Sequence, residues 1–282
     1  MKLNLIFIAL FLSLLPDFFE LNENFNSDAK IALRMLIFMI FLWLSEAIPV
    51  SITAFIPIIF SPFYLDLAFK EIISPYSSSV VFLLLGGFIL AAGFEKSNLH
   101  RRIAMKIVLK FGGTKQQVLC CFIFSTAFFS MWFSNTATCM LMLPIASYLV
   151  NNSFKDVDDP IFLKLLILSI AYSSSIGGIS TPIGTIPNAI MIGFLKDNYQ
   201  LDISFVSWMT FMLPIAITLL FSMLVYFSLQ IKGLKEKIDK KKIDLEYSKL
   251  GKFSKNELIA SVILFVTALM WIFKININKY FD

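Results

Sequence analysis

The sequence predicts an all-α membrane protein that contains a re-entrant helical hairpin and a broken transmembrane helix. Hydrophobic residues make up 58% of the 282 residues, and charged residues make up only 15%. Several apolar runs reach the ~20 residues that a helix needs to cross a bilayer. Two of those runs, residues 118–150 and 161–195, are each interrupted by uncharged polar residues. These observations place the chain in a membrane and mark two irregular segments within it.

The two interruptions have the composition of a binding site. The first, residues 129–139, reads FSMWFSNTATC, and the second, residues 177–188, reads GGISTPIGTIPN. Hydrocarbon offers polar groups no water, so irregular backbone is tolerated at membrane depth only where protein buries it or a cavity wets it. Secondary transporters place their substrate and ion sites at breaks of this kind. The pair therefore predicts a transporter binding site.

Four apolar segments precede the first interruption. Residues 3–15 predict a first transmembrane helix, because no small-residue cleavage site of a signal peptide follows them. A second helix is expected over residues 31–47 and ends before Pro49, which lacks a backbone donor. Residues 52–67 and 80–94 form the third and fourth segments.

Two stretches rich in lysine and arginine determine the expected orientation. In residues 95–110, apolar residues at positions 99, 103, 107 and 108 recur at helical spacing with basic residues between them. This pattern predicts an amphipathic helix on the cytosolic surface. Residues 232–255 are also strongly basic and belong on the same side. The N-terminus is then cytoplasmic, with Asn24 and Asn198 outside.

Residues 116–150 have two interpretations. Each half is too short for a comfortable full span, which favours a re-entrant hairpin that enters from the inside and turns at Ser134, Asn135 and Thr136. The alternative is one continuous kinked helix whose hydroxyls bond to their own preceding turn. The hairpin makes both basic stretches cytosolic, so the expected orientation favours it.

The hairpin divides the chain into regions with different expected roles. A scaffold of helices would carry a transport region, and a basic cytosolic segment would lead into a second repeat. The predicted regions are scaffold helices and the amphipathic helix (1–115), a transport region (116–230) made of the hairpin (116–150), a broken helix (160–196) and a further span (205–230), the basic segment (231–256), and the first helix of a second repeat (257–282).

Several titratable and sulfur-bearing side chains have two interpretations. Glu46 is either a coupling carboxylate or, more simply, a carboxylate at the cytosolic end of the second helix. His100 is either a proton relay or part of the interfacial surface of the amphipathic helix. The three cysteines, Cys120, Cys121 and Cys139, lie in apolar surroundings without metal-ligand spacing, so we interpret them as small core residues.

Four segments resemble, in the same order, the N-terminal half of the divalent anion:sodium symporter family: residues 43–49, 95–104, 131–138 and 176–188. The Ser-Asn-Thr triplet at 134–136 resembles the tip of the family's hairpin. The resemblance implies a sodium-coupled symporter of divalent anions in a bacterial inner membrane, with a C4-dicarboxylate as the expected substrate. It also implies elevator-type alternating access, in which the hairpin and the broken helix move against the scaffold.

This family is built from two inverted repeats, and the resemblance covers only the first. The sequence has a single Ser-Asn-Thr triplet and no second counterpart of the loop at 181–188. We therefore expect a truncated carrier or one half of a split carrier, acting as a homodimer or with a chain that carries the second repeat. The alternative is a non-transporting membrane subunit, or an inactive remnant, that keeps the fold of the half.

The resemblance also implies the residues of the site. A co-transported sodium ion would be bound by Ser130, Ser134, Asn135 and the backbone of Gly184. A substrate carboxylate would be bound by Asn135, Thr136, Thr185 and Pro187.

The charges of the interrupted runs limit how an anion is held. Between residues 118 and 195 the only cations are Lys155 and Lys164, near a cytosolic loop, so no arginine clamps a carboxylate. We expect compensation from bound sodium and from the N-termini of helices that start after Thr136 and after Pro187. Each such N-terminus carries about half a positive charge.

Two other classes of function are not expected. The serines of the interruptions have no nearby histidine, lysine or aspartate to activate them, and no Gly-x-Ser-x-Gly elbow is present, so the chain is not predicted to be an enzyme. The net charge of +5 is concentrated in two stretches between apolar segments, so it does not indicate a nucleic-acid partner.

Overall fold

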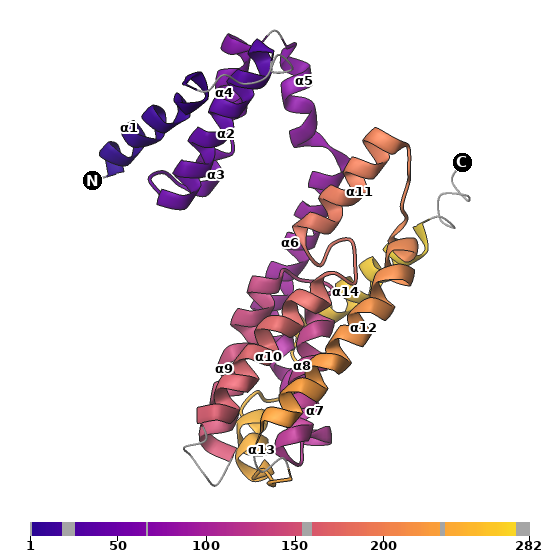
Figure 1. Ribbon diagram of the computed structural model, residues 1–282. Coiled ribbons are helices and arrows are strands. Elements are labelled where there is room, and N and C mark those ends of the chain that lie inside the picture. Colours follow the sequence, from indigo (N-terminus) through magenta and orange to yellow (C-terminus); the bar gives the residue numbers. More distant parts are fainter. Residues whose placement is uncertain (1, 19–25, 66, 154–159, 232–234, 275–282) are drawn as a thin grey trace. The chain divides into compact units, whose positions relative to one another are not determined.

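A computed structural model describes residues 2–18, 26–65, 67–153, 160–231 and 235–274. Apart from one isolated bridge between Thr114 and Lys237, the regular structure of these residues is helical, which confirms the all-α class. The helices (Figure 1) are α1 (Lys2–Ser13), α2 (Ser27–Ser45), α3 (Val50–Thr53), α4 (Ile56–Tyr64), α5 (Phe69–Ile73), α6 (Ser79–Ser97), α7 (Leu99–Phe111), α8 (Lys115–Ser130), α9 (Asn135–Ser153), α10 (Pro160–Gly178), α11 (Ile186–Tyr199), α12 (Phe205–Gln230), α13 (Lys240–Ser248) and α14 (Lys255–Ile272), with 3-10 turns at Leu15–Asp17 and Ser74–Ser77.

The chain forms two compact units, residues 1–81 and 82–282. In the first unit α1 packs along α2, and α4 contacts α2 and α5. The N-cap of α2 is Asn26, whose Oδ1 accepts a hydrogen bond from Ala29 N at 2.8 Å. A small apolar cluster fills this unit and contains Ala9, Leu42, Ala47 and Ile56.

Glu46 ends α2 in the first unit. Its backbone adopts the left-handed conformation (φ 47°, ψ 32°) of a helix C-cap, and its side chain is exposed. This is the helix-end position that the simpler interpretation of Glu46 predicted. The side of the membrane on which it lies stays a prediction.

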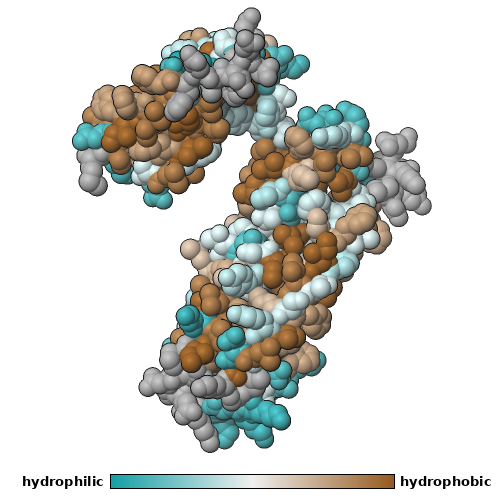
Figure 2. Space-filling model, in the orientation of Figure 1, coloured by the Kyte–Doolittle hydropathy of each residue, from teal (hydrophilic) through white to brown (hydrophobic). Residues whose placement is uncertain are grey.

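Four helical segments of the described residues are long and apolar enough to cross a membrane: Phe69–Ser97, Ile161–Gly178, Phe205–Gln230 and Lys255–Ile272. Figure 2 shows broad hydrophobic areas on the visible face of each unit, as a membrane protein requires. By contrast, α1 has 12 residues, fewer than the ~20 of a full span. The described helix is therefore too short to cross a bilayer alone, although the sequence predicted a first transmembrane helix there.

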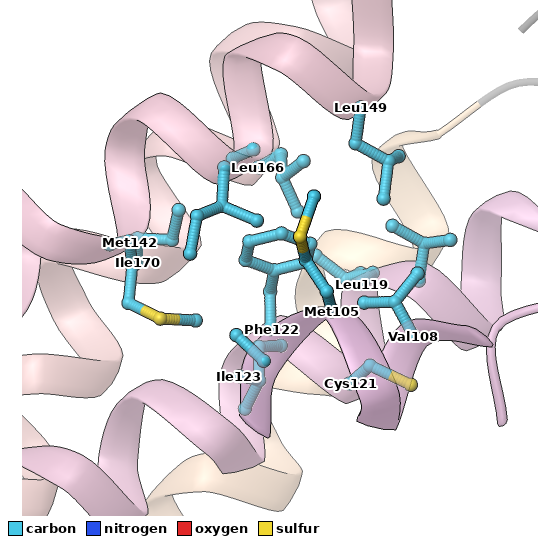
Figure 3. Close-up of a cluster of buried hydrophobic side chains, with 14 of the residues drawn as sticks. Met105, Val108, Leu119, Cys121, Phe122, Ile123, Met142, Leu149, Leu166 and Ile170 are labelled. Carbon is cyan, nitrogen blue, oxygen red and sulfur yellow. The ribbon is translucent and has the colours of Figure 1, made fainter. Parts of the chain in front are cut away.

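The second unit is centred on α8 and α10, which pack along each other with α9 beside them. Phe122 of α8, Met142 of α9 and Ile170 of α10 are fully buried in the same cluster (Figure 3). The two interruptions follow directly on these packed helices, at the C-terminal ends of α8 and α10. The core therefore determines how the interruptions lie relative to each other.

The first interruption is a turn between two separate helices. It occupies residues 131–134, and α9 begins at Asn135, earlier than the start after Thr136 that the sequence predicted. Because α7 contacts both α8 and α9, the chain runs back along itself beyond the turn. The structure therefore has two helices joined by a turn at this point. Entry of this hairpin into a membrane from the cytosolic side stays a prediction.

The second interruption lies between α10 and α11, as predicted. It covers residues 179–185, and α11 then starts at Ile186, one residue before Pro187 rather than after it. A proline in the first turn of a helix costs no backbone hydrogen bond, because the N–H groups there have no intrahelical partner. The helix continues to Tyr199, three residues beyond the end at 196 that the sequence predicted for the broken helix.

A connecting segment between α12 and α14 docks on α7 and on the start of α8. Lys115 N donates to Glu236 O at 3.1 Å, and Ile238 N donates to Gly113 O at 3.2 Å. Lys240 Nζ donates to Leu109 O at 2.8 Å. The segment is therefore held against α7 by backbone and side-chain contacts.

This docking changes the predicted character of α7. Positions 99 and 108 of the predicted apolar face are buried, but Ile103 and Ile107 are only half-buried, and His100 and Arg102 are buried as well. The helix is enclosed on several sides by α8, α9 and α13 rather than lying only on a membrane surface.

His100 is the clearest correction to the sequence-based interpretation of α7. Its side chain is 6% exposed and lies against the ring of Phe94, so it is not part of an interfacial surface. Burial, together with the nearby charge of Arg101, lowers the pKa of His100 to about 4. His100 is therefore neutral at physiological pH, and its Nδ1 has no hydrogen-bond partner among the described residues.

Candidate functional site

The two interruptions dock on each other through glycines. A Cβ added to Gly177 would overlap the backbone of Ala127 in α8, and one added to Gly178 would overlap Oδ1 of Asn135. A Cβ on Gly184 would lie 2.5 Å from Gly178 O and 2.8 Å from the carbonyl oxygen of Ser130. These distances exclude any side chain, so glycine is required for the close approach of the two segments.

Three oxygen atoms surround one hydroxyl proton at the hairpin tip. Ser130 Oγ lies 2.9 Å from Asn135 Oδ1 and 2.6 Å from the carbonyl oxygen of Ser174. A serine hydroxyl has a single proton, and both neighbours are acceptors, so it satisfies only one of them well. Ser130 is fully buried, whereas Asn135 is half-buried. The cluster therefore has surplus lone pairs directed at one place, which favours a cation.

The second interruption is tied to the hairpin and to itself by side-chain hydrogen bonds. Thr181 Oγ1 donates to Met131 O at 2.5 Å and accepts from Gly184 N at 3.0 Å. Asn188 Nδ2 donates to the carbonyl oxygens of Gly178 and Thr181, at 2.8 Å each. The irregular backbone is thus satisfied by buried polar side chains, as non-helical chain at membrane depth requires.

A tryptophan of α12 also supports the second interruption. Trp208 Nε1 donates to Ile179 O at 3.0 Å, and the ring is buried. The hydrogen bond satisfies a carbonyl of the non-helical segment with a side chain from another helix. It fixes the segment against α12.

Helix ends of both polarities meet at the two interruptions. The C-termini of α8 and α10 precede them, and the N-termini of α9 and α11 follow them. Helix C-termini carry partial negative charge and favour cations, whereas N-termini carry partial positive charge and favour anions. Thr185, the N-cap of α11, makes no side-chain capping bond. In the same turn Pro187 has no N–H, and Asn188 N donates to Thr185 O at 3.2 Å, so few N–H groups of α11 are left for a ligand.

The predicted sodium ligands are largely brought together. Ser130, Asn135 and Gly184 lie within one cluster of contacts. Ser134 lies at the start of α9, where its Oγ accepts from Ala137 N at 3.3 Å and caps the helix. No contact joins Ser134 Oγ to the other three residues in the part of the chain that the structure describes.

The predicted substrate residues lie at the surface of the same region. Thr136 and Pro187 are exposed, and Thr185 and Asn135 are half-buried. No side-chain hydrogen bond involves Thr136 or Thr185 among the described residues, so their hydroxyls are not committed to the fold. Their roles as ligands stay predictions.

Sequence reasoning missed three polar residues of the site. Ser174 contributes its carbonyl oxygen to the cluster, and its Oγ lies 2.9 Å from Cys139 Sγ. Thr181 and Asn188 connect the interruption to the hairpin and to itself. A sequence signal existed for Asn188, because a carboxamide in the first turn of an otherwise apolar helix must find a buried partner.

Charged groups are scarce around this site. Of the two lysines between residues 118 and 195, Lys164 is described and exposed at the far end of α10, and Lys155 lies outside the described residues. The described residues also contain no group of three His, Cys, Asp or Glu side chains suited to a metal ion. Neutral oxygens and helix ends are thus the electrostatic features of the site.

Comparison with known proteins identifies the family. The citrate transporter family (CitMHS) matches residues 40–280, which is most of the chain. The chain belongs to the divalent anion:sodium symporter family. This confirms the resemblance that four sequence segments indicated.

Curated relatives carry the name sodium-dependent dicarboxylate transporter SdcS. The protein of Staphylococcus saprophyticus is 33% identical over 282 residues, covering 95% of this chain and 52% of the relative. The proteins of Staphylococcus aureus strains USA300 and NCTC 8325 are 34% identical over 244 residues, covering 82% of this chain and 46% of the relative. The chain spans about half the length of the curated relatives it matches.

Proposed function

We propose that this chain supplies one sodium site and one wall of a dicarboxylate site in a sodium-coupled carrier. The observation that carries the proposal is the cluster of oxygens around Ser130, formed by Asn135 and the carbonyl of Ser174 where two broken helices meet. The relatives named as sodium-dependent dicarboxylate transporters support the choice of ion and substrate. No specific observation favours the alternative of a non-transporting subunit.

Sodium would bind between the hairpin tip and the second interruption. Ser130 Oγ, Asn135 Oδ1 and Ser174 O are neutral oxygens of the kind that sodium uses at broken helices. A bound sodium ion would be coordinated by lone pairs of these three oxygens. The hydroxyl proton of Ser130 would then point away from the ion, toward a single acceptor. The backbone of Gly184, next to Ser130 O, and the hydroxyl of Ser134 would complete the coordination.

The dicarboxylate would bind on the exposed side of the same residues. One carboxylate would face the N-termini of α9 and α11, with Thr136 and Thr185 as hydroxyl donors and Pro187 shaping the wall. Asn135 would serve both ligands, with Oδ1 toward sodium and Nδ2 toward the carboxylate. Sodium at the tip would supply positive charge that no side chain nearby provides.

Movement of the hairpin with the second interruption would give alternating access. The glycine contacts and the Thr181–Met131 hydrogen bond make these segments one packed body, which suits elevator-type motion. The proposed site residues provide one hairpin tip and one pair of helix N-termini. A second, inverted set, from another segment or chain, would enclose the other carboxylate.

Sodium binding by the chain is the first test of this proposal. Purified in detergent, the chain should unfold at a higher temperature in NaCl than in KCl at equal ionic strength, because an ion that binds the folded state stabilises it. Ser130→Ala should remove the difference. Ser169→Ala is the matched control, because Ser169 is equally buried on α10 but donates only to its own helix, at Leu166 O. Equal unfolding temperatures in both salts would contradict the sodium site.

Transport is the second test. Residues 1–282 alone in liposomes should show no sodium-driven succinate uptake, because one wall leaves the dianion largely uncompensated. Adding a chain that bears the second repeat should produce uptake that a sodium gradient drives. Robust uptake by residues 1–282 alone would overturn the one-wall assignment, and absence of uptake with both chains present would overturn the transport function.

A further inference from the structure

Three ion pairs turn the carboxylates of the connecting segment inward. Each pair joins an acid of residues 235–257 to a cation of α7 or of the start of α8. The pairs are Glu236 with Lys115 (2.5 Å), Glu246 with Arg101 (2.9 Å) and Glu257 with Arg102 (2.5 Å). Most of the negative charge of this segment is therefore neutralised by cations of the helices against which the segment packs.

Most lysines of the same region are exposed, although Lys240 turns inward to Leu109 O. The exposed lysines that have no ion pair among the described residues include Lys106, Lys237, Lys241, Lys242, Lys252 and Lys255. We refer to these six residues as the basic surface. Two acids of the same segment, Asp239 and Asp244, are also exposed, so the basic surface keeps a net positive charge of smaller size than its six lysines alone would give.

The basic surface is held close to the ends of two candidate membrane spans. Its connecting segment runs from the end of α12 to the start of α14, and both helices are long and apolar enough to cross a bilayer. Ile238 and Ile243 are buried and keep the segment against α7. Figure 2 shows hydrophilic residues gathered at the end of the second unit where Figure 1 places α13.

Apolar side chains are exposed among these lysines. Leu245 of α13 is 64% exposed, and Phe253, next to Lys252, is 52% exposed. Basic residues together with exposed apolar side chains are typical of chain that lies at the boundary between lipid headgroups and acyl chains. A nucleic acid would match the charge but would leave Leu245 in water.

We propose that the basic surface binds the anionic headgroups of phospholipids in the surrounding membrane. The six ammonium groups would contact headgroup phosphates, while Leu245 and Phe253 would enter the boundary region below them. Each lysine near an anionic lipid surface strengthens binding about fivefold at moderate salt, so the surface would hold several anionic lipids around the α7–α13 end. The contact would stabilise the docking of the connecting segment on α7.

The test is a titration of the detergent-solubilised chain with lipid, in which the thermal unfolding midpoint is measured at each lipid concentration. Dioctanoyl phosphatidylglycerol should raise the midpoint at low salt, and dioctanoyl phosphatidylcholine should not. In Lys241→Gln/Lys242→Gln the half-saturating concentration of phosphatidylglycerol should rise about 25-fold, as two lysines at fivefold each require. Potassium chloride at high concentration should weaken the effect, because exposed charges are screened.

Lys70→Gln/Lys196→Gln is the matched control. It removes the same charge from exposed lysines of α5 and α11 and should titrate like the unmodified chain. Equal stabilisation by both lipids, or an equal loss in the control, would overturn the proposal. So would an RNA oligonucleotide that raises the midpoint as much as phosphatidylglycerol and loses its effect in the Lys241/Lys242 variant, since the surface would then bind any polyanion.

Discussion

Arg102 of α7 and Glu257 of α14 form a buried ion pair, with Arg102 Nε 2.5 Å from Glu257 Oε1. The same guanidinium donates to the carbonyl oxygens of Leu250 and Gly251, at 2.9 and 3.0 Å. Glu257 Oε2 in turn accepts from Ser254 N at 2.6 Å, in the capping box that starts α14. One arginine of the amphipathic helix therefore fixes where α14 begins.

Replacing Arg102 should be strongly destabilising. Arg102→Ala leaves the buried carboxylate of Glu257 without its partner, which costs about 3 kcal/mol of unfolding free energy. It also removes the donor of three carbonyl groups, those of Leu250, Gly251 and Lys252. Arg101→Ala is the matched control on the same helix. It should cost much less, because Arg101 is 41% exposed and its pair with Glu246 is open to water.

Unfolding in detergent by denaturant or heat measures both changes. The double variant Arg102→Met/Glu257→Met should be less destabilised than the sum of its single variants, because it leaves no buried charge unpaired. Equal effects of Arg101→Ala and Arg102→Ala would show that the buried pair has no special role.

Acidification should destabilise the chain through His100. Its folded-state pKa of about 4 lies below the ordinary value of 6.5, so the unfolded chain binds more protons than the folded chain between these values. Stability is therefore full above pH 6.5 and is lost as the pH falls toward 4. Thermal unfolding midpoints should decrease from pH 7.5 to pH 5, and His100→Gln should flatten that decrease. An identical pH profile in His100→Gln would contradict the assignment.

The sequence predicted the elements around the site better than their mutual contacts. Polar residues inside apolar runs indicated both interruptions, because such residues need partners in a membrane. The partners themselves lie far away in sequence: Thr181 bonds Met131, and Arg102 bonds Glu257. Neither periodicity nor composition contains such pairings.

The burial of α7 could not be predicted for the same reason. Helical spacing described only one apolar face, at positions 99, 103, 107 and 108. Enclosure of the helix by α8, α9 and α13 buries His100 and Arg102 as well, and that enclosure depends on where the connecting segment docks. Tertiary contacts therefore decided the environment of the one histidine.

Gly184 should tolerate no side chain. In Gly184→Ala the new Cβ would lie 2.5 Å from Gly178 O, so the second interruption must move away from Ser130. We expect loss of the sodium-dependent rise in unfolding temperature. Gly86→Ala is the control, because nothing lies within 4 Å of a Cβ there, and alanine in a helix is favoured over glycine by up to about 1 kcal/mol. Sodium stabilisation that persists in Gly184→Ala would remove Gly184 from the site.

Asn135→Ala should weaken sodium and dicarboxylate binding together in the two-chain assembly. The variant removes Oδ1 from the oxygen cluster and Nδ2 from the proposed carboxylate contact. Because coupling between two ligands is reciprocal, losing the shared residue should also reduce the dependence of succinate affinity on sodium.

Succinate binding at a series of sodium concentrations measures this coupling in the Asn135 variant. Asn198→Ala, at the far end of α11, should leave both affinities unchanged, because its side chain bonds only to Phe194 O. A variant at Asn135 that loses succinate binding but keeps its sodium dependence would show that the two ligands do not share this residue.

The sidedness of Asn152 decides whether the hairpin is re-entrant. Asn152 lies near the end of α9, and α9 contacts α7 and α13, the helices that carry Lys106 and Lys241. In a chain with Cys120, Cys121 and Cys139 replaced by alanine, single cysteines at positions 106, 152 and 241 should react with an impermeant maleimide only from the cytosolic side. A cysteine at Asn198 should react only from the outside, because the second interruption and α11 complete one crossing. If the cysteine at position 152 reacts from the outside while those at 106 and 241 react from the inside, α8 and α9 together cross the membrane and the re-entrant hairpin is wrong.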